Sequence, residues 1–548
     1  MKSLLKKVLV LVLALSCALG AFMGCGGTED PNNPPEEPVD PDRTPVWVTI
    51  INDGMGIDWM KYDVKAGFEK MFPEYQLLVD TNYREANLEE MADSHFDVYL
   101  NARDSYKMFA GSGYLGDITE WITEPCYDEN YNLVPSGGTV SIKDRMPESY
   151  QTLYNHNGSY YATPYYEGIW GIWYDHDLLG PDGEDLLNYG NGPDGKEGTT
   201  DDGLPSTWKE FLSLLDEIRG AGLVPFCASD IDYVRKGMFD AFVAAYEGKH
   251  DFDINFSFNG TLQTPVKGAN GEDIYEINAN PGSANFKYLA KQYGRLAALT
   301  MINEIVKPEN FSDASYKGGH GHTDAQAEFV QSIQMQNKGK RVAMFMEGAY
   351  WHNEARPVFA AMEKLNPNYG YGKRDFRYMA LPKFDGSDSS GVPETKNYGK
   401  TTMYSTGSDA FIFVNAKSAS KPEVKAFYQY LNSNEGCFLN VKGSCAPRTI
   451  ATKFTKEQLA ELAPVTQNIY AYKAEPTYEM CYELSTCKTR YNQYDRFLTW
   501  FHYTKVSDGT VTNNPWSYLI SHPGKANVED YYNGQFRYWN SVRYDALG

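Results

Sequence analysis

The spacing of apolar residues in the first part of the chain alternates between a strand pattern and a helix pattern. Residues 46–51 form a short apolar run that predicts a buried strand. The next apolar residues recur at helical spacing, at Met60, Val64, Phe68, Met71 and Phe72. Pro73 ends this helix, and residues 75–80 return to a strand pattern. A strand, a loop, a helix and a second strand in this order predict an α/β lobe.

Similar patterns recur through the rest of the chain. Residues 96–100 form another strand pattern, and residues 208–219 form an amphipathic helix with a capping box that starts at Thr207. Residues 339–351 predict a turn, an apolar strand and a glycine step, and residues 409–433 predict a strand followed by a helix. The fold class expected from these patterns is α/β.

Length and charge narrow the architecture and the partners. At 548 residues the chain is too long for one hydrophobic core, because single cores stop growing at about 250–300 residues. Two lobes or more are therefore expected. The formal net charge is −22 and the sequence pI is about 4.9. An acidic surface repels nucleic-acid backbones and anionic membranes, so a neutral ligand is a better match.

The first 25 residues have the pattern of an export signal. A basic start precedes an apolar stretch and small residues before Cys25. The segment 22–25 resembles the lipobox of bacterial lipoproteins, which predicts that Cys25 carries a lipid, although Cys17 is a competing site. A single uncleaved membrane-spanning helix is the alternative. In both cases the rest of the chain lies outside the cytoplasm.

The next segment and the cysteines add little about function. Residues 26–45 are rich in proline and acidic residues and have almost nothing to bury, so they predict a disordered tether. The close pairs Cys437/Cys445 and Cys481/Cys487 could form disulfides in an oxidising exterior. No cysteine pair has the spacing of a zinc site.

Five short motifs follow one another in a characteristic order. They are NGSYYATP at 157–164, WYDHDLL at 173–179, LPSTWKE at 204–210, GKRVAMFMEGAYW at 339–351 and LPKFDG at 381–386. This order resembles the family 1 extracellular solute-binding proteins, which are sugar-binding lipoproteins of ABC transporters related to the maltose-binding protein. The resemblance covers roughly residues 46–450 as spaced motifs.

The resemblance implies a two-lobed fold of the periplasmic-binding-protein type II class. Each lobe would be a mixed β-sheet flanked by helices, with a hinge between the lobes. Lobe 1 would contain residues 46–160 and about 400–445, and lobe 2 residues 161–399 and about 446–548. The chain would cross between the lobes near 161–167, near 390–407 and near 445. Residues 450–548 are expected to be helical and to pack on lobe 2.

A sugar site needs aromatic rings for the C–H faces of pyranoses and carboxylates for hydroxyl groups. Loops after parallel strands are the expected place for such residues, and the resemblance implies a ligand carboxylate at Asp104 and a stacking ring at Tyr350. The chain is rich in suitable side chains, with 42 tyrosines and 10 tryptophans. The predicted ligand-binding residues are Asp53, Asp58, Trp59, Asp104, Glu167, Trp170, Asp230, Tyr233, Tyr350 and Trp351.

Structural roles are the alternative for each of these residues. Trp170 and Trp351 could equally be core residues, and a core position is favoured for Trp173. Helix capping alone could explain Asp58. Trp351 could replace Tyr350 as the stacking platform.

Residues 182–203 form an insert rich in aspartate, asparagine and glycine. Its oxygen atoms could form a calcium cage, with Asp182, Asp185, Asp194, Asp201 and Asp202 as ligands. The spacing does not match the helix-flanked calcium loop, so a turn-rich surface loop is the alternative. His320 and His322 could bind a metal with a third ligand, or could be exposed and idle. No other cofactor is expected.

These observations together predict a lipid-anchored binding protein on the outer face of a bacterial cell membrane. We expect it to be a monomer that captures a carbohydrate between its lobes and delivers it unaltered to the permease subunits of an ABC importer. A surface glycoside hydrolase or lyase is the alternative from another class, since paired carboxylates are abundant. A third hypothesis keeps the binding role with a non-sugar polar solute.

Overall fold

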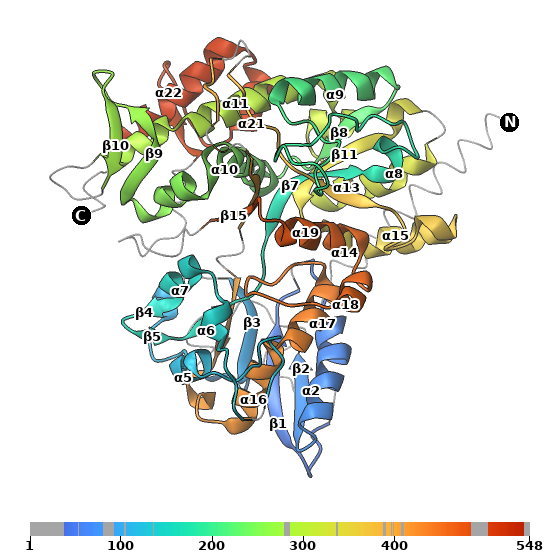
Figure 1. Ribbon diagram of the computed structural model, residues 1–548, viewed down its shortest axis with the longest axis vertical. Helices are drawn as coiled ribbons and strands as arrows, with labels where there is room; N and C mark the ends of the chain where they lie inside the picture. Colours follow the sequence, from blue (N-terminus) through green and yellow to red (C-terminus); the bar gives the residue numbers. More distant parts are fainter. Residues whose placement is uncertain are drawn as a thin grey trace.

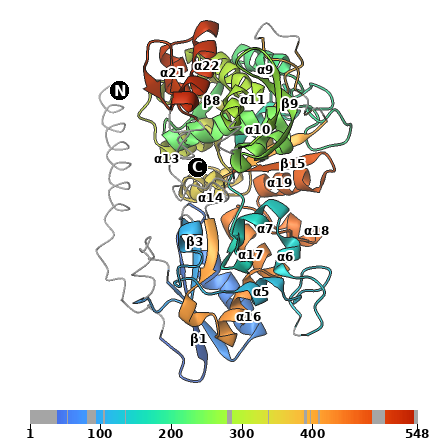
Figure 2. The same ribbon diagram turned by 90° about the vertical axis from the view of Figure 1, so that its left-hand side faces the viewer.

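Two lobes, each built on its own β-sheet, make up the described part of the chain. The computed structural model describes residues 38–541, apart from 53, 81–92, 104–105, 135, 279–284, 336–337, 387–390, 396, 398, 407–409 and 484–501. Figures 1 and 2 show the lobe with the amino-terminal strand, which we call lobe 1, below the larger lobe 2. The predicted α/β class with two lobes is confirmed.

The sheet of lobe 1 has the order β2-β1-β3-β14-β6. Strand β1 runs parallel to β2 and β3, whereas β14 is antiparallel to β3 and β6. Three of the five strands come from the first part of the chain, and β14 returns from far along it. The bounds are β2 (Tyr75–Asp80), β1 (Thr44–Ile50), β3 (Val98–Arg103), β14 (Ala410–Val414) and β6 (Ala162–Pro164).

Helices from both parts of the chain cover this sheet. The helix predicted between the first two strands begins as a π-helical turn, and α16 packs on β1 while α17 packs on η1. Between α7 and β6 a small hairpin turns at Asn157 and Gly158, which both have positive φ, as the dipeptide predicts. The bounds are η1 (Trp59–Val64), α2 (Lys65–Met71), α4 (Tyr106–Phe109), α5 (Thr119–Thr123), α6 (Ile142–Arg145), α7 (Glu148–Tyr154), β4 (Asn155–His156), β5 (Ser159–Tyr160), α16 (Pro422–Leu431) and α17 (Asn434–Ser444).

The sheet of lobe 2 has the order β15-β13-β7-β11-β8, with β12 also paired to β7. Every residue of β7 and of β11 is buried, because helices cover both faces of the sheet. Strand β11 is parallel to β8 and antiparallel to β7. The bounds are β15 (Tyr478–Tyr482), β13 (Thr401–Ser405), β7 (Ile169–Asp175), β11 (Val342–Gly348), β8 (Val224–Ala228) and β12 (Phe376–Met379).

Most of the described helices belong to lobe 2. The capping box predicted at the start of α9 is present, since Thr207 accepts from the Glu210 N–H and Glu210 accepts from the Thr207 N–H. The bounds are α8 (His176–Leu179), α9 (Trp208–Gly220), α10 (Asp232–Ser257), α11 (Tyr293–Ile305), α12 (Asp313–Lys317), α13 (His322–Gln331), α14 (Trp351–Glu354) and α15 (Arg356–Glu363). A hairpin of β9 (Gly260–Lys267) and β10 (Asp273–Ile277) adds to this lobe.

The last hundred residues only partly follow the expectation of helices on lobe 2. Helix α19 (Pro464–Ala474) packs on β12, and α22 (Lys525–Ser541) packs on α11 with α21 (Pro515–Ser521) beside them. The short α18 (Lys456–Ala460) instead lies near α17, since Leu459 and Leu462 pack on Phe438. This region also supplies β15 and the small pair β16 (Thr504–Lys505) and β17 (Val511–Thr512). Among the described residues, no helix is long and apolar enough to cross a membrane.

The free thiols contradict one of the suggested disulfides. Cys126, Cys227, Cys437, Cys445 and Cys481 are all buried and unpaired, and Cys487 lies outside the described residues. Cys437 and Cys445 are eight residues apart along α17 and its end. At 1.5 Å per residue they are separated by about 12 Å, which is too far for a disulfide.

The chain passes between the two sheets three times. Residues 165–168 join β6 to β7, and the segment from Cys445 joins α17 to α19. Between them, β13 of lobe 2 is followed in the chain by β14 of lobe 1, with residues 407–409 outside the described residues. These crossings lie close to those that the family resemblance implies. Strand β6 belongs to the sheet of lobe 1 and β13 to that of lobe 2; the predicted lobe ranges remain a prediction.

Glu167 and Gly168 connect the three crossings to one another. Its backbone N–H donates to Pro447 O over 2.8 Å, and the Thr406 N–H donates to Gly168 O over 2.9 Å. The buried Glu167 carboxylate accepts from Lys473 Nζ at 2.6 Å and from the Tyr482 hydroxyl at 3.1 Å. The hinge therefore closes around one ion pair that is largely shielded from water.

We predict that Lys473→Ala destabilises the protein by about 3 kcal/mol, because it leaves the Glu167 carboxylate buried without its cation. The measurement is the free energy of unfolding in urea. Lys425→Ala is the control, since Lys425 pairs with the exposed Glu120 and Glu124 and its loss should cost less than about 1 kcal/mol. Equal losses in the two variants would contradict this role of the hinge pair.

Glu347 is a buried carboxyl group in the middle of lobe 2. It lies in β11 with no exposed surface, and Gly348 N–H donates to its Oε1 over 2.9 Å. Burial, with the neighbouring Glu354 adding to it, raises the pKa of Glu347 from 4.5 to about 8. The neutral acid is therefore the form that the fold accepts at neutral pH.

We predict that Glu347→Gln raises the midpoint of thermal unfolding more at pH 8 than at pH 5. The stability that neutral Glu347 contributes is complete below its unfolded pKa of 4.5 and is lost as pH rises to about 8. The amide cannot ionise, so the variant escapes this loss. Thermal scans of both proteins across this range test it, and a constant difference between them would refute it.

Candidate functional site

Several of the predicted site residues cannot be placed. Asp53 and Asp104 lie outside the described residues, and Tyr233 is described only by its backbone in α10. Asp58 is exposed and precedes η1, but its side chain makes no capping hydrogen bond. The capping alternative for Asp58 is therefore wrong.

Trp59 has a structural position in lobe 1. Its ring is 2% exposed, and its indole Nε1 donates to Gly56 O over 2.9 Å. A Cβ on Gly443 would stand 2.2 Å from Trp59 Cβ, so α17 packs directly on this side chain. Trp59 therefore fixes the loop before η1 through its hydrogen bond to Gly56.

Trp351 and Trp173 are core residues, as the structural alternative proposed. Trp351 has no exposed surface and contacts Phe329, Phe345 and Phe376 at ring-centroid distances of 5.3–5.5 Å. Trp173 is also fully buried and donates to Glu347 O over 2.8 Å.

Glu167, another predicted ligand-binding residue, lies in the hinge. Its carboxylate already accepts hydrogen bonds from Lys473 and Tyr482.

Trp170 and Tyr350 form an aromatic pair at the lobe 2 side of the hinge. Their ring centroids are 6.1 Å apart with an interplanar angle of 87°. Trp170 is only 3% exposed, as its core alternative proposed, whereas Tyr350 is partly exposed. Trp170 follows the first crossing by two residues, and its Nε1 donates to Thr406 Oγ1 of the second crossing over 2.9 Å. Gly237 of α10 allows the indole to lie close, since a Cβ there would be 2.7 Å from the ring.

A chain of buried polar groups lies beside this pair. Tyr404 pairs with Trp170 across β13 and β7, and its hydroxyl lies 3.1 Å from Asp240 Oδ2 and 3.2 Å from Glu483 Oε2. His502 Nε2 lies 2.9 Å from Asp240 Oδ1. Two carboxylates around one phenol raise the Tyr404 pKa further above its ordinary value, which burial already raises. Carboxylates and an imidazole near aromatic rings can pair with ligand hydroxyl groups.

Asp230 belongs to a second polar group at the end of β8. Its carboxylate accepts from Gly319 N–H, and its own N–H donates to His320 O over 3.0 Å. His320 pairs with Glu328 at 3.0 Å, and His322 pairs with Glu354 at 3.3 Å. These carboxylates raise the pKa of both histidines. Among the described residues, no three metal-binding side chains come together, so the two histidines gain no third ligand.

The aspartates of the 182–203 insert accept hydrogen bonds from its own turns and from Thr477. Asp201 Oδ2 accepts from Asp194 N–H over 3.0 Å, Asp194 Oδ2 accepts from the Thr477 hydroxyl over 2.9 Å, and Asp202 accepts from Gly198 N–H. Burial, with Asp194 nearby, raises the Asp201 pKa to about 6. None of the five predicted aspartates joins a metal-binding group in the described structure, which favours the turn-rich loop.

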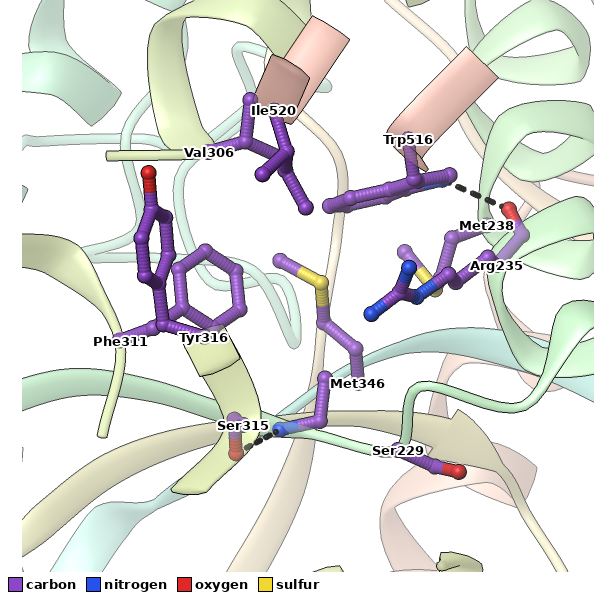
Figure 3. Close-up of a pocket in the computed structure, with 11 residues that line it drawn as sticks. Ser229, Arg235, Met238, Val306, Phe311, Ser315, Tyr316, Met346, Trp516 and Ile520 are labelled. Carbon is purple, nitrogen blue, oxygen red and sulfur yellow. Dashed lines mark hydrogen bonds between the residues drawn. The ribbon is translucent and has the colours of Figure 1, made fainter. Parts of the chain in front are cut away.

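A cavity in lobe 2 opens between the end of β8, the start of α10 and α21. Its cavity volume is only about 20 Å³, and it is open to solvent on one side. Figure 3 shows the indole of Trp516 above Arg235 and Met346, with Trp516 Nε1 donating to Arg235 O. The lining is mostly apolar, from Ala228, Ser229, Arg235, Met238, Val306, Phe311, Ser315, Tyr316, Met346, Trp516 and Ile520.

The cavity and the aromatic pair share one face of the lobe 2 sheet. Met346 lines the cavity. Gly348 is two residues further along β11, so it lies on the same face of the sheet, because successive residues of a strand alternate between the two faces. Trp170 lies directly opposite Gly348 in the antiparallel pairing, so it projects to this face as well. The two features together form the candidate site, which borders the hinge.

Sequence reasoning missed the polar half of this site. Asp240 lies inside a helix between phenylalanines, and Glu483, His502 and Trp516 belong to the carboxyl-terminal region, where no motif was found. No spacing or turn signal marks them, because contacts between distant segments bring them together. Only Trp170, Tyr350 and the neighbourhood of Asp230 were indicated by the motifs.

Comparisons with known proteins agree with this architecture. Residues 56–436 match the family of bacterial extracellular solute-binding proteins, and no curated protein matches the chain. The apo form of RafE from Streptococcus pneumoniae is similar, with 15% identity and a TM-score of 0.52 over 91% of this chain and 99% of RafE.

Two further solved structures share the fold. A chitin oligosaccharide binding protein has 13% identity and a TM-score of 0.52 over 91% of this chain and 99% of its own. A protein from a study of xylan utilization by Caldanaerobius polysaccharolyticus has 13% identity and a TM-score of 0.54, over 90% and 99%. The family match covers more than half of the sequence. The chain therefore belongs to the bacterial extracellular solute-binding proteins.

Proposed function

We propose that this protein captures a carbohydrate of the oligosaccharide class between its lobes and delivers it unaltered to an ABC importer. The observation that carries the proposal is the Trp170–Tyr350 pair beside the Asp240–Tyr404 polar network, next to the hinge. Aromatic rings cover the C–H faces of sugars, and buried carboxylates select for hydroxyl groups that satisfy them. RafE, which shares the fold, has also been solved in complex with raffinose.

The surroundings of the protein are part of the same proposal. The export signal and Cys25 support a lipid anchor on the extracellular face of the cell membrane, with residues 26–45 as the tether. A monomer on such a tether can reach the permease subunits of an importer. The net charge of −22 argues against nucleic acid as a partner.

The residues that we propose for ligand contact are a subset of those predicted from the sequence, with additions. Tyr350 would provide the exposed ring and the buried Trp170 would support it, with Asp58, Asp230 and Tyr233 as further candidates. Asp53 and Asp104 stay predictions, since both lie outside the described residues. Asp240, His502 and Trp516 join this set through their place beside the aromatic pair and the cavity. Trp59, Glu167 and Trp351 instead support the site from the core and the hinge.

A glycoside hydrolase is the competing hypothesis, because such enzymes use a pair of carboxyl groups. Asp240 and Glu483 are such a pair, since both lie within hydrogen-bond distance of the Tyr404 hydroxyl. Family and fold favour binding, and both carboxylates are engaged by Tyr404. We propose that they orient the ligand and do not cleave it.

We predict one-to-one binding of an oligosaccharide with no chemical change. Isothermal titration against raffinose, chitin oligosaccharides, xylan oligosaccharides and a panel of polyols and amino acids identifies the ligand class. Chromatography of the ligand after hours of incubation tests for cleavage. Released monosaccharide would support the hydrolase, and binding of an amino acid alone would replace the carbohydrate.

We predict that Tyr350→Ala weakens the binding of that oligosaccharide about 30-fold, because an aromatic contact at an interface is worth about 2 kcal/mol. Tyr350→Phe keeps the ring and should retain most of the affinity. Tyr275→Ala is the control, since Tyr275 is 45% exposed on the β9–β10 hairpin. Calorimetry that finds Tyr350→Ala as tight as the control would remove Tyr350 from the site.

A further inference from the structure

Helix α14 and the start of α15 form a direct contact between the lobes. Figures 1 and 2 both place α14 at the boundary of the lobes. Asn353 Nδ2 of α14 donates to Gly54 O in the loop that follows β1 of lobe 1, over 3.0 Å. Asn353 is only 4% exposed, so this hydrogen bond is shielded from water.

Arg356 orients the Asn353 amide and adds a second bond between the lobes. Its Nε donates to Asn353 Oδ1, which leaves the Nδ2 group of the same amide to face Gly54. Its Nη2 donates to Gly443 O at the end of α17 over 3.2 Å. The Arg356 guanidinium carbon lies 4.2 Å from the centre of the Tyr371 ring, and this cation–π contact fixes the orientation of the guanidinium group.

The lobe 1 side of the contact has the matching shape. Gly54 and Gly56 have φ angles of +77° and +72°, and a Cβ on either would be 3.1 Å from a side-chain atom of Glu354 or Asn353. Side chains at these two positions would be strained and would hold the lobes apart. The two glycines therefore form a socket into which α14 fits.

The socket also has hydrogen bonds of its own. Asn52 accepts from Met55 N–H through its backbone and from Gly56 N–H through its side chain, both over 2.9 Å. Trp59 donates to Gly56 O from below. On the other side, His322 and Gln326 hold the Glu354 carboxylate. Both surfaces are preorganised, which lowers the entropy cost of joining them.

We propose that Asn353 is the residue through which the lobes lock together and that Arg356 is its positioning residue. The 353–356 contact stabilises the closed arrangement and so sets how long a bound ligand is retained. A hydrogen bond across the boundary exists only when the lobes meet, so its strength enters the closed state alone. The inference relies on the proposed function only in assuming that the ligand binds between the lobes.

Asn353→Asp tests the lock at almost constant side-chain size. It replaces the donor with a carboxylate oxygen that repels Gly54 O, while Arg356 keeps an acceptor. Asn368→Asp is the matched control, because Asn368 is exposed on lobe 2 and carries the same change of charge. We expect Asn353→Asp to increase the radius of gyration in small-angle X-ray scattering, and to speed ligand dissociation about tenfold.

Arg356→Lys tests the positioning role. Lysine keeps the charge but lacks the fork that reaches Asn353 and Gly443 together, so we expect the same opening in a weaker form. Arg377→Lys, at a pair with Asp375 within lobe 2, is the control. Circular dichroism confirms that each variant is folded.

The two proposals fail in different ways. Scattering of the ligand-free protein needs no sugar, so opening by Asn353→Asp supports the lock even if every sugar in the panel fails to bind. If Asn353→Asp and Asn368→Asp have the same radius of gyration without ligand, and the same dissociation rate with any sugar that binds, the lock is refuted. Tight sugar binding in that case would leave the proposed function intact.

Discussion

The ion pair of Glu167 and Lys473 is the constraint on which the two-lobed arrangement depends. Three chain crossings meet at one place, and each would expose backbone groups to the gap between lobes if they were not tied together. The Glu167 backbone bonds to the third crossing, while its carboxylate reaches α19 and β15 of lobe 2. These bonds join the crossings into one unit, which is the arrangement expected of a hinge between two rigid lobes.

The candidate site follows from this constraint. Trp170 is set by the first crossing and by its bond to Thr406 of the second, so the aromatic surface has a defined place relative to the hinge. The completely buried strands β7 and β11 lie beneath the site, and α10 places Asp240 and Arg235 above these strands. On the opposite face of the sheet, Glu347 and Trp351 lie between β11 and α13. Helix α14, which contains Trp351, makes the contact with lobe 1.

Local patterns predicted the elements well and the roles of single residues less well. The capping box at Thr207, the turn at Asn157 and the early strands were predicted because each depends on neighbours in sequence. Trp351 illustrates the limit, since an aromatic residue after a glycine step has the same local pattern whether it faces a cleft or a core. Its burial depends on Phe329 and Phe376, which come from other elements.

By itself the sequence determined the α/β class, the two lobes and the family, because periodicity, length and ordered motifs can be read from contiguous segments. Only the tertiary structure decided that Glu167 belongs to the hinge, that Cys437 and Cys445 stay apart, and that Asp240, Tyr404 and His502 meet beside Trp170. The physical reason is that burial and charge pairing arise between residues about three hundred positions apart, as for Glu167 and Lys473. No local pattern encodes such a contact.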